Sequence, residues 1–290
     1  MFYLENDRLK VEIQKPGELY NGSRFDWTGF ISQITLDRSF SYCVPEQLES
    51  GKGTGGLGFC NEFGIDLPIG YEAIEVGELF PKIGVGLLKK DQETDYDFFK
   101  PHEVQPSQVK IREAASAIIF ETANSCPSGY GYHLLKEVAI EDNRLIISYR
   151  LTNTGQYPIH TNEYSHNFIG INNQFIGEHY QLTMPRMDQI DVTAGSIVRS
   201  QDHLSWPATP ESDFYATIDW KVENGSYNWD VYHGEVGAGV RELSEFQPSK
   251  VALWGHAHVV CPEVFIAIEL NADETKSWKR VYEFYQDTES

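Results

Sequence analysis

Short runs of alternating apolar and polar residues dominate the sequence, and they constrain the fold more than any other feature. The clearest runs are Val109–Thr122, Lys136–Glu141 and Leu145–Asn153. In the third run the odd positions from 145 to 151 hold Leu, Ile, Tyr and Leu. Successive side chains of a strand point to opposite faces, so this pattern predicts a half-buried strand. The turn residues at 141–143 just before it predict a hairpin.

The same alternation returns through the second half of the chain. It predicts further strands at Gln189–Val198, Ala216–Val222, Trp229–Val231, Gly239–Leu243, Val251–Trp254, Val264–Leu270 and Ser277–Phe284. No segment shows an amphipathic helical stripe over three turns. With 41% hydrophobic residues the chain can bury a large core. We therefore expect one all-β domain over residues 1–290, a large antiparallel sandwich or barrel.

The charge balance excludes several classes of partner. The sequence has 23 Lys and Arg against 43 Asp and Glu, a net charge of −20. Such a chain repels polyanions, so we expect neither nucleic acid nor an anionic membrane surface as a partner. No apolar run is long enough to span a bilayer, and Met1–Lys15 shows no signal-peptide pattern, which predicts a cytoplasmic protein.

The cysteines are few and scattered, without a C-x-x-C pair. They are Cys43, Cys60, Cys126 and Cys261. This spacing predicts buried free thiols rather than a disulfide scaffold.

Two loop-rich regions interrupt the strands. Glu46–Gly58 contains a glycine run at 51–56, which is typical of a mobile surface loop. A phosphate-binding loop would need its Lys and Ser or Thr at the end of the glycines and at the start of a helix, so we reject a nucleotide site. Asp91–Pro106 is acidic, aromatic and proline-bearing, and indicates an ordered excursion over the sheet.

Candidate chemistry lies in the second half of the chain. Polar and aromatic residues converge in Thr161–Phe168, and Glu263 directly precedes the apolar run Val264–Ile268. In content and order these segments resemble the aldose 1-epimerase (galactose mutarotase) superfamily over roughly residues 130–290. The residues that carry the resemblance are Asn153, Gly155, Asn162, His166, Phe168, Cys261, Glu263, Asp273, Glu274, Trp278, Arg280, Tyr282 and Phe284. Arg24–Ile31 looks like the family's opening strands.

The resemblance implies an antiparallel β-supersandwich that interconverts the α and β anomers of an aldose without a cofactor. By carry-over, Glu263 is the general base on the anomeric hydroxyl and His166 donates a proton to the ring oxygen. We expect the two groups on opposite sides of one acetal centre, each with a pKa near neutrality. Histidine has an ordinary pKa of about 6.5, whereas Glu263 needs burial to raise its pKa.

The sequence also departs from that family, which carries a second active-site histidine and an arginine in its first third. No histidine occurs between Met1 and Lys100, and the basic residues available there are Arg24, Lys82 and Lys89. This departure suggests a distinct subgroup that acts on an acidic or modified sugar.

Further candidates for binding the sugar lie along the whole chain. Asp230 is a candidate for binding hydroxyls, and the candidates for stacking on a sugar face are Trp27, Trp229, Trp254 and Trp278. The expected partner is a monosaccharide or its derivative, and a homodimer is left open.

Two alternatives compete with the mutarotase interpretation. His256 and His258, followed by Glu263, match the spacing of a cupin metal motif if they share one strand face. In a milder version, one of these histidines supplies the missing second imidazole to the sugar site. The other alternative is a sugar-binding protein without catalytic activity, because a fold alone does not confer activity.

Overall fold

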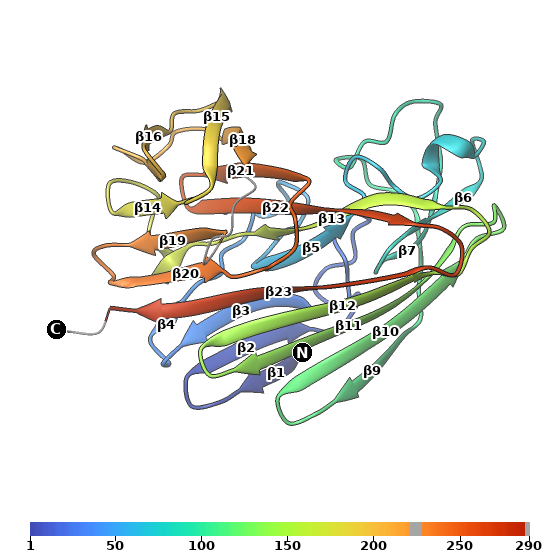
Figure 1. Ribbon diagram of the computed structural model, residues 1–290, viewed down its shortest axis with the longest axis horizontal. Helices are drawn as coiled ribbons and strands as arrows, with labels where there is room; N and C mark the ends of the chain where they lie inside the picture. Colours follow the sequence, from blue (N-terminus) through green and yellow to red (C-terminus); the bar gives the residue numbers. More distant parts are fainter. Residues whose placement is uncertain (221–227, 288–290) are drawn as a thin grey trace.

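The computed structural model describes residues 1–220 and 228–287, and within them the chain is built almost entirely of antiparallel strands (Figure 1). The helical segments in this part are two single 3-10 turns, η1 (Tyr71–Ala73) and η2 (Ile171–Asn173). The all-β antiparallel architecture predicted from the alternation is thus confirmed.

Two large sheets form the body of the molecule. In pairing order the first contains β1 (Phe2–Glu5), β2 (Leu9–Gln14), β3 (Phe30–Leu36), β5 (Phe59–Phe63), β13 (Ile159–Asn167), β22 (Val259–Leu270), β21 (Lys250–His256), β18 (Phe214–Trp220) and β15 (Met187–Ala194), with β4 (Phe40–Ser41) beside β3. The second contains β16 (Val198–Ser200), β17 (His203–Ser205), β14 (Tyr180–Thr183), β19 (Trp229–His233), β20 (Ala238–Glu242), β23 (Thr275–Gln286), β12 (Arg144–Asn153), β11 (Gly131–Glu141), β10 (Ala117–Ser125) and β9 (Val109–Glu113).

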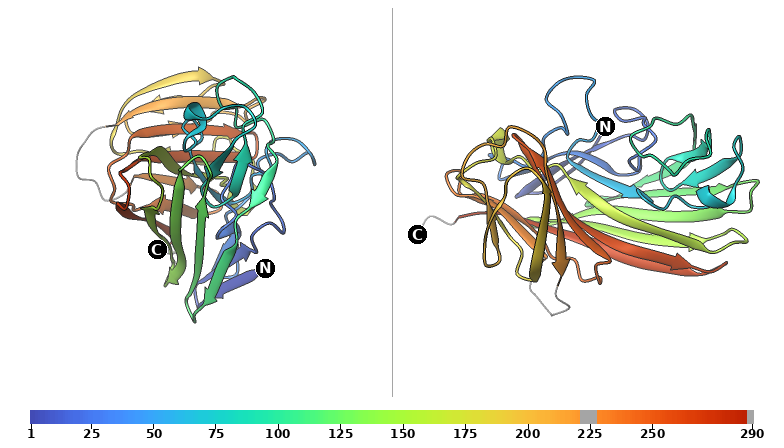
Figure 2. Two further views of the ribbon diagram at one scale, coloured as in Figure 1. Left: turned by 90° about the vertical axis from the view of Figure 1, so that its right-hand side faces the viewer. Right: turned by 90° about the horizontal axis from the view of Figure 1, so that it is seen from above.

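A small third sheet packs against this body. It consists of β6 (Leu79–Lys82), β7 (Gly86–Lys89) and β8 (Val104–Pro106). Together with the loops between residues 64 and 103 it gathers at one end of the molecule, at the right in Figure 1 and again at the right of the second view in Figure 2.

Most of the predicted strands agree with the observed ones, with two clear exceptions. Gln189–Val198 is not one strand, because β15 ends at Ala194 and β16, which belongs to the other large sheet, begins at Val198. The hairpin of β11 and β12 closes at the predicted turn, where Glu141 pairs with Arg144. Val109–Thr122, however, is not one strand, because the chain reverses at residues 114–116 and the amide of Ala114 donates to the carbonyl of Ala117 (2.8 Å). Alternation continues across this reversal, so the pattern alone concealed it. Residues 221–222 of the predicted strand Ala216–Val222 lie outside the described residues.

A buried ionic group joins the two large sheets. Glu163 on β13 of the first sheet accepts hydrogen bonds from Arg280 on β23 of the second, at 2.9 Å from Nη2. The same guanidinium donates to Glu242 on β20 (2.9 Å), and Trp278 also donates to Glu163 (3.1 Å). All three charged side chains are inaccessible to solvent.

A second buried cation extends this chain of contacts. Lys136 on β11 donates to Asp26 (3.0 Å) and to the amide oxygen of Asn61 on β5 (2.8 Å). The amide nitrogen of Asn61 donates in turn to Glu163 (3.2 Å). A continuous polar path therefore crosses the interior between the sheets, surrounded by the apolar core.

Two other expectations can be compared directly with the structure. All four cysteines are free and buried, as predicted. No helix in residues 1–220 or 228–287 has the length and apolar character needed to span a bilayer.

Removing Arg280 should destabilise the protein strongly. The Arg280→Leu variant leaves Glu163 and Glu242 buried without their cation, which costs about 3–5 kcal/mol in the free energy of unfolding. Urea denaturation followed by circular dichroism measures this loss. The matched control is Arg144→Leu, which removes the half-exposed pair between Arg144 on β12 and Glu283 on β23 and should cost about 1 kcal/mol or less. Equal losses in the two variants would contradict a special role for the buried pair.

Candidate functional site

Strand alternation separates a core face from an outer face on the first sheet. On β13, Glu163 points into the interior, so Tyr164 and His166, at odd separations from it, point to the opposite face. Glu163 pairs with Ile266 on β22. If this antiparallel register is continued for three more residues, His166 lies opposite Glu263. The fold therefore brings the two predicted catalytic residues together on neighbouring strands.

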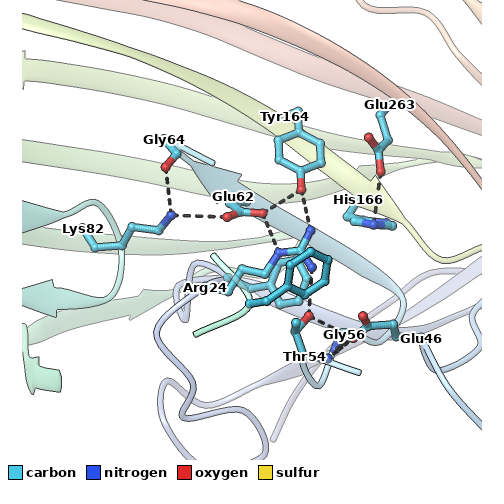
Figure 3. A network of polar contacts seen from close by, with 12 residues as sticks. Arg24, Glu46, Thr54, Gly56, Glu62, Gly64, Lys82, Tyr164, His166 and Glu263 are labelled. Atoms are coloured by element: carbon cyan, nitrogen blue, oxygen red, sulfur yellow. Dashed lines mark hydrogen bonds and ion pairs between the residues drawn. The ribbon is translucent and has the colours of Figure 1, made fainter. Parts of the chain in front are cut away.

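His166 and Glu263 form a direct contact. Nε2 of His166 lies 3.1 Å from Oε1 of Glu263, and each side chain is only 7% exposed (Figure 3). The imidazole stacks on Phe168 with ring centroids 4.1 Å apart, and Trp254 meets its edge at 5.4 Å. Aromatic packing thus fixes the position of the histidine ring.

Burial changes the protonation of both groups. It raises the pKa of Glu263 to about 8, although Arg24 and Lys250 oppose the rise. Burial, together with the positive charge of Arg24, lowers the pKa of His166 well below its usual range. Nδ1 of His166 is buried and finds no hydrogen-bond partner in the described part of the chain, so no second carboxylate supports an imidazolium. At neutral pH the pair therefore holds one proton, and burial favours its uncharged form.

A network of charged side chains lies beside the pair (Figure 3). Arg24 donates through Nε to Glu62 (2.8 Å) and through Nη2 to the hydroxyl of Tyr164 (3.0 Å), which itself donates to Glu62 (2.6 Å). The guanidinium lies between the rings of Phe25 and Phe98, each centroid 4.5 Å away. Hydrogen bonds therefore hold the guanidinium of Arg24 within its own plane, and an aromatic ring packs on each of its two faces.

The glycine-rich loop completes this side of the site. Nη1 of Arg24 donates to Thr54 (2.9 Å), and Glu46 accepts hydrogen bonds from the backbone of Thr54 (2.6 Å) and of Gly56 (3.1 Å). A Cβ atom at Gly56 would lie 2.3 Å from the ring of Phe168, so only glycine allows this approach. The run at 51–56 thus packs against the site and is more than a surface loop.

These residues enclose a cavity of about 340 Å³. Its lining includes Arg24, Tyr164, His166, Trp254, Glu263 and Phe265. At its rim, Lys250 lies 3.7 Å from Asp66. The cavity therefore combines an acid–base pair, aromatic faces and compensated charges, an arrangement suited to a small polar ligand.

The whole architecture resembles that of known solved structures. A galactose mutarotase related enzyme from Lactobacillus acidophilus matches with a TM-score of 0.60 at 10% identity, covering 99% of this chain and 98% of that one. A galactose mutarotase-like protein from Lactobacillus casei gives 0.60 at 11% identity over 98% and 100% of the two chains. An aldose epimerase homologue from C. elegans gives 0.55 at 10% identity over 99% of both.

The chain has the galactose mutarotase-like fold. This confirms the fold that the sequence resemblance implied. No protein-family model and no curated protein matches the sequence. At about 10% identity the likeness to the solved structures concerns the fold.

Within this mutarotase-like fold, only some of the predicted sugar-binding residues reach the cavity. Arg24 and Trp254 line it. Lys82 lies behind it, where its ammonium group donates to Glu62 (3.3 Å) and to the carbonyl of Gly64 (3.2 Å).

Other candidates lie elsewhere. Asp230 is on β19 of the second sheet and accepts a hydrogen bond from Tyr285 (2.5 Å), so the structure does not bring it to the cavity. Lys89 is exposed on β7. The remaining tryptophans, Trp27, Trp229 and Trp278, are buried away from the cavity lining.

The metal-binding alternative does not match the structure. His256 pairs with Val259 across a tight turn that contains His258, so the two histidines do not share a strand face. The ring of His258 contacts the carbonyl of Pro45 (2.8 Å), and the two imidazole centroids are 5.9 Å apart. Across residues 1–220 and 228–287, no three His, Cys, Asp or Glu side chains are grouped to hold a metal ion. Neither histidine belongs to the cavity lining that contains His166.

Sequence reasoning missed Glu62, Tyr164 and Phe98. A signal existed for the first two. Glu62 is the one charged residue of the short segment Phe59–Phe63, which begins and ends with phenylalanine. Tyr164 is two residues before His166 and therefore on the same strand face. Phe98 comes from an irregular segment, and no local pattern connects it to Arg24.

The buried Glu263 should make stability depend on pH. Between the ordinary glutamate pKa and about 8, the folded state keeps a proton that the unfolded state has released, so the free energy of unfolding falls as pH rises. His166 titrates well below neutrality and adds nothing above about pH 7. Glu263→Gln should therefore gain stability over the wild type between about pH 7 and pH 8.5. Urea unfolding across this range measures the difference, and parallel curves would disprove the raised pKa.

Proposed function

We propose that this protein interconverts the α and β anomers of a sugar, with Glu263 and His166 as the base and acid. The observation that carries the proposal is the direct contact between these two side chains at the floor of a ligand-sized cavity. The galactose mutarotase-like fold supports it, because two of the solved structures that share the fold are described as a mutarotase related enzyme and an aldose epimerase homologue.

The geometry of the pair suits the reaction. The anomeric hydroxyl oxygen and the ring oxygen of a pyranose are bonded to the same carbon, so an acid and a base that serve them have to be neighbours. Nε2 and Oε1 are 3.1 Å apart, side by side on adjacent strands. This adjacency follows from the pairing of β13 with β22.

The reaction then follows from one shared proton. Glu263 removes the proton of the anomeric hydroxyl while His166 donates a proton to the ring oxygen, and the bond between C1 and the ring oxygen breaks to give an open-chain aldehyde. Rotation about the C1–C2 bond presents the other face of the carbonyl. The ring hydroxyl attacks, His166 recovers its proton and Glu263 returns the other one. The pair ends in its starting state, as a reversible catalyst requires.

The surroundings of the pair favour repeated proton exchange. Because burial raises the pKa of Glu263 and lowers that of His166, the resting pair is uncharged, with its proton on Glu263. Transfer of that proton to Nε2 across the 3.1 Å contact gives the carboxylate that acts as base and the imidazolium that acts as acid. The ring of Phe168 prevents the imidazole from turning away.

Replacing the base should remove the activity. Glu263→Gln keeps the shape of the side chain but cannot accept the proton, so the rate of anomer exchange should fall by about 10²–10⁴-fold. Polarimetry and exchange NMR with freshly dissolved aldoses measure this rate. Glu269→Gln, an exposed change on the same strand, is the control and should leave the rate unchanged.

Two outcomes would contradict the proposal. Undiminished exchange in Glu263→Gln would remove this residue from the base role. Sugars that bind to the wild type without turnover above the spontaneous rate would favour the sugar-binding protein without catalysis.

The pH profile provides a separate test. The active pair carries one proton, and above a pKa of about 8 that proton is lost, so kcat should decline in the alkaline range. Because the pKa of His166 is lowered well below its usual range, activity should persist below pH 6.5, down to the lowered value. Initial rates corrected for the spontaneous reaction measure the profile. A rate that rises steadily above about pH 8 would show that the pair is not the acid–base catalyst.

A further inference from the structure

A second cavity, of about 650 Å³, adjoins the one that contains the catalytic pair. Asp66 lines both cavities. The irregular segment 94–99 also contributes to both, because Thr94, Asp95 and Tyr96 line the second and Phe98 and Phe99 line the first. The two spaces are therefore bordered by the same stretches of chain. We call the larger one the outer groove.

The outer groove extends along β13 away from the catalytic pair. His160, which lines it, lies on the same strand face as Tyr164 and His166, because their numbers differ by even steps. Six residues of extended strand span about 20 Å. The two cavities together thus offer far more length than one sugar ring occupies.

The chemistry of the outer groove disfavours anions and suits a ligand rich in hydroxyl groups. Four exposed carboxylates line it, from Asp66, Glu72, Glu93 and Asp95. The one lysine or arginine among its described lining residues is Lys90, whose ammonium group donates to the carbonyls of Tyr71 (3.2 Å) and Ile74 (2.8 Å). Carboxylates accept hydrogen bonds from hydroxyls and repel anions.

An aromatic platform accompanies these acceptors. Tyr130 lines the groove and is partly exposed. Its ring packs so closely on Gly70 that a Cβ atom there would lie 2.5 Å away, and Tyr157 flanks it with centroids 5.3 Å apart. A ring held in this way can cover the apolar face of a sugar with little loss of conformational entropy.

We propose that the outer groove binds the additional units of a neutral oligosaccharide whose reducing end lies at His166 and Glu263. This inference rests on the proposed function, because only the reducing-end unit has a free anomeric hydroxyl to interconvert. The remainder of such a chain has to leave the catalytic cavity, and the outer groove provides that path along β13. The substrate class is thus a short neutral glycan rather than a free monosaccharide or an acidic sugar.

Calorimetric binding to the full chain tests the inference. The probes are maltotriose, cellotriose and β-1,4-galactotriose, compared with glucose and galactose. We expect at least one trisaccharide to bind about tenfold more tightly than its monosaccharide. Tyr130→Ala and Glu72→Gln should each remove most of this advantage and leave monosaccharide binding unchanged.

Two control variants show whether the effect is specific to the outer groove. Tyr3→Ala replaces a tyrosine that is 55% exposed on β1, and Glu75→Gln replaces a carboxylate three residues from Glu72 and outside the groove lining. Both should behave like the wild type. The mild Glu72→Gln change keeps the test valid if Tyr130→Ala does not fold.

The outcomes distinguish the two proposals. Trisaccharides that bind no more tightly than monosaccharides, or an advantage that survives both groove variants, would overturn the outer-groove inference even if anomers are interconverted. Absence of turnover on every sugar would overturn the proposed function, whereas the binding comparison would still decide whether the groove accepts a glycan.

Discussion

The position of the site depends on the buried ion pair between Glu163 and Arg280. This contact joins the first sheet to the second, and Glu163 is immediately followed on β13 by the first residue of the site face, Tyr164. Burying charges is costly, so a pair of this kind contributes specificity of arrangement more than net stability. Here it fixes which face of β13 is turned inward. A shift by one residue would turn His166 toward the interior between the two sheets and leave Glu163 without its cation.

Much of the fold could be predicted because antiparallel strands with one buried face leave a period of two in the sequence. The hairpin of β11 and β12 was found in this way. The pattern fails where alternation continues through a turn, as at residues 114–116 and at His256–His258. It also contains no information on which distant strands pair, and the contact between β13 and β22 joins segments about a hundred residues apart.

Candidate residues of the site could be predicted only where the order of motifs along the sequence indicated them. His166 and Glu263 were predicted as a pair from the order of the motifs, and the structure places the two side chains in contact. The positions of Lys82 and Asp230 could not be read from residue type, because they depend on the partner that each side chain meets, Glu62 in another sheet for Lys82 and Tyr285 for Asp230. The role of Glu62 likewise depends on its hydrogen bond with Arg24, which is 38 positions away in the sequence.

The alternation along β13 assigns alternate residues of one strand to two different tasks, packing in the interior and lining the cavity. Odd-numbered positions such as Glu163 serve the interior, whereas even-numbered positions such as Tyr164 and His166 face the cavity. Substitutions on the outer face can therefore change which ligand is accepted while the core remains intact, and ligand preference can drift among descendants of one ancestral chain. Insertions have no such freedom, because adding a single residue would exchange the two faces. The strand thus tolerates substitutions on its outer face but does not tolerate a change in its length.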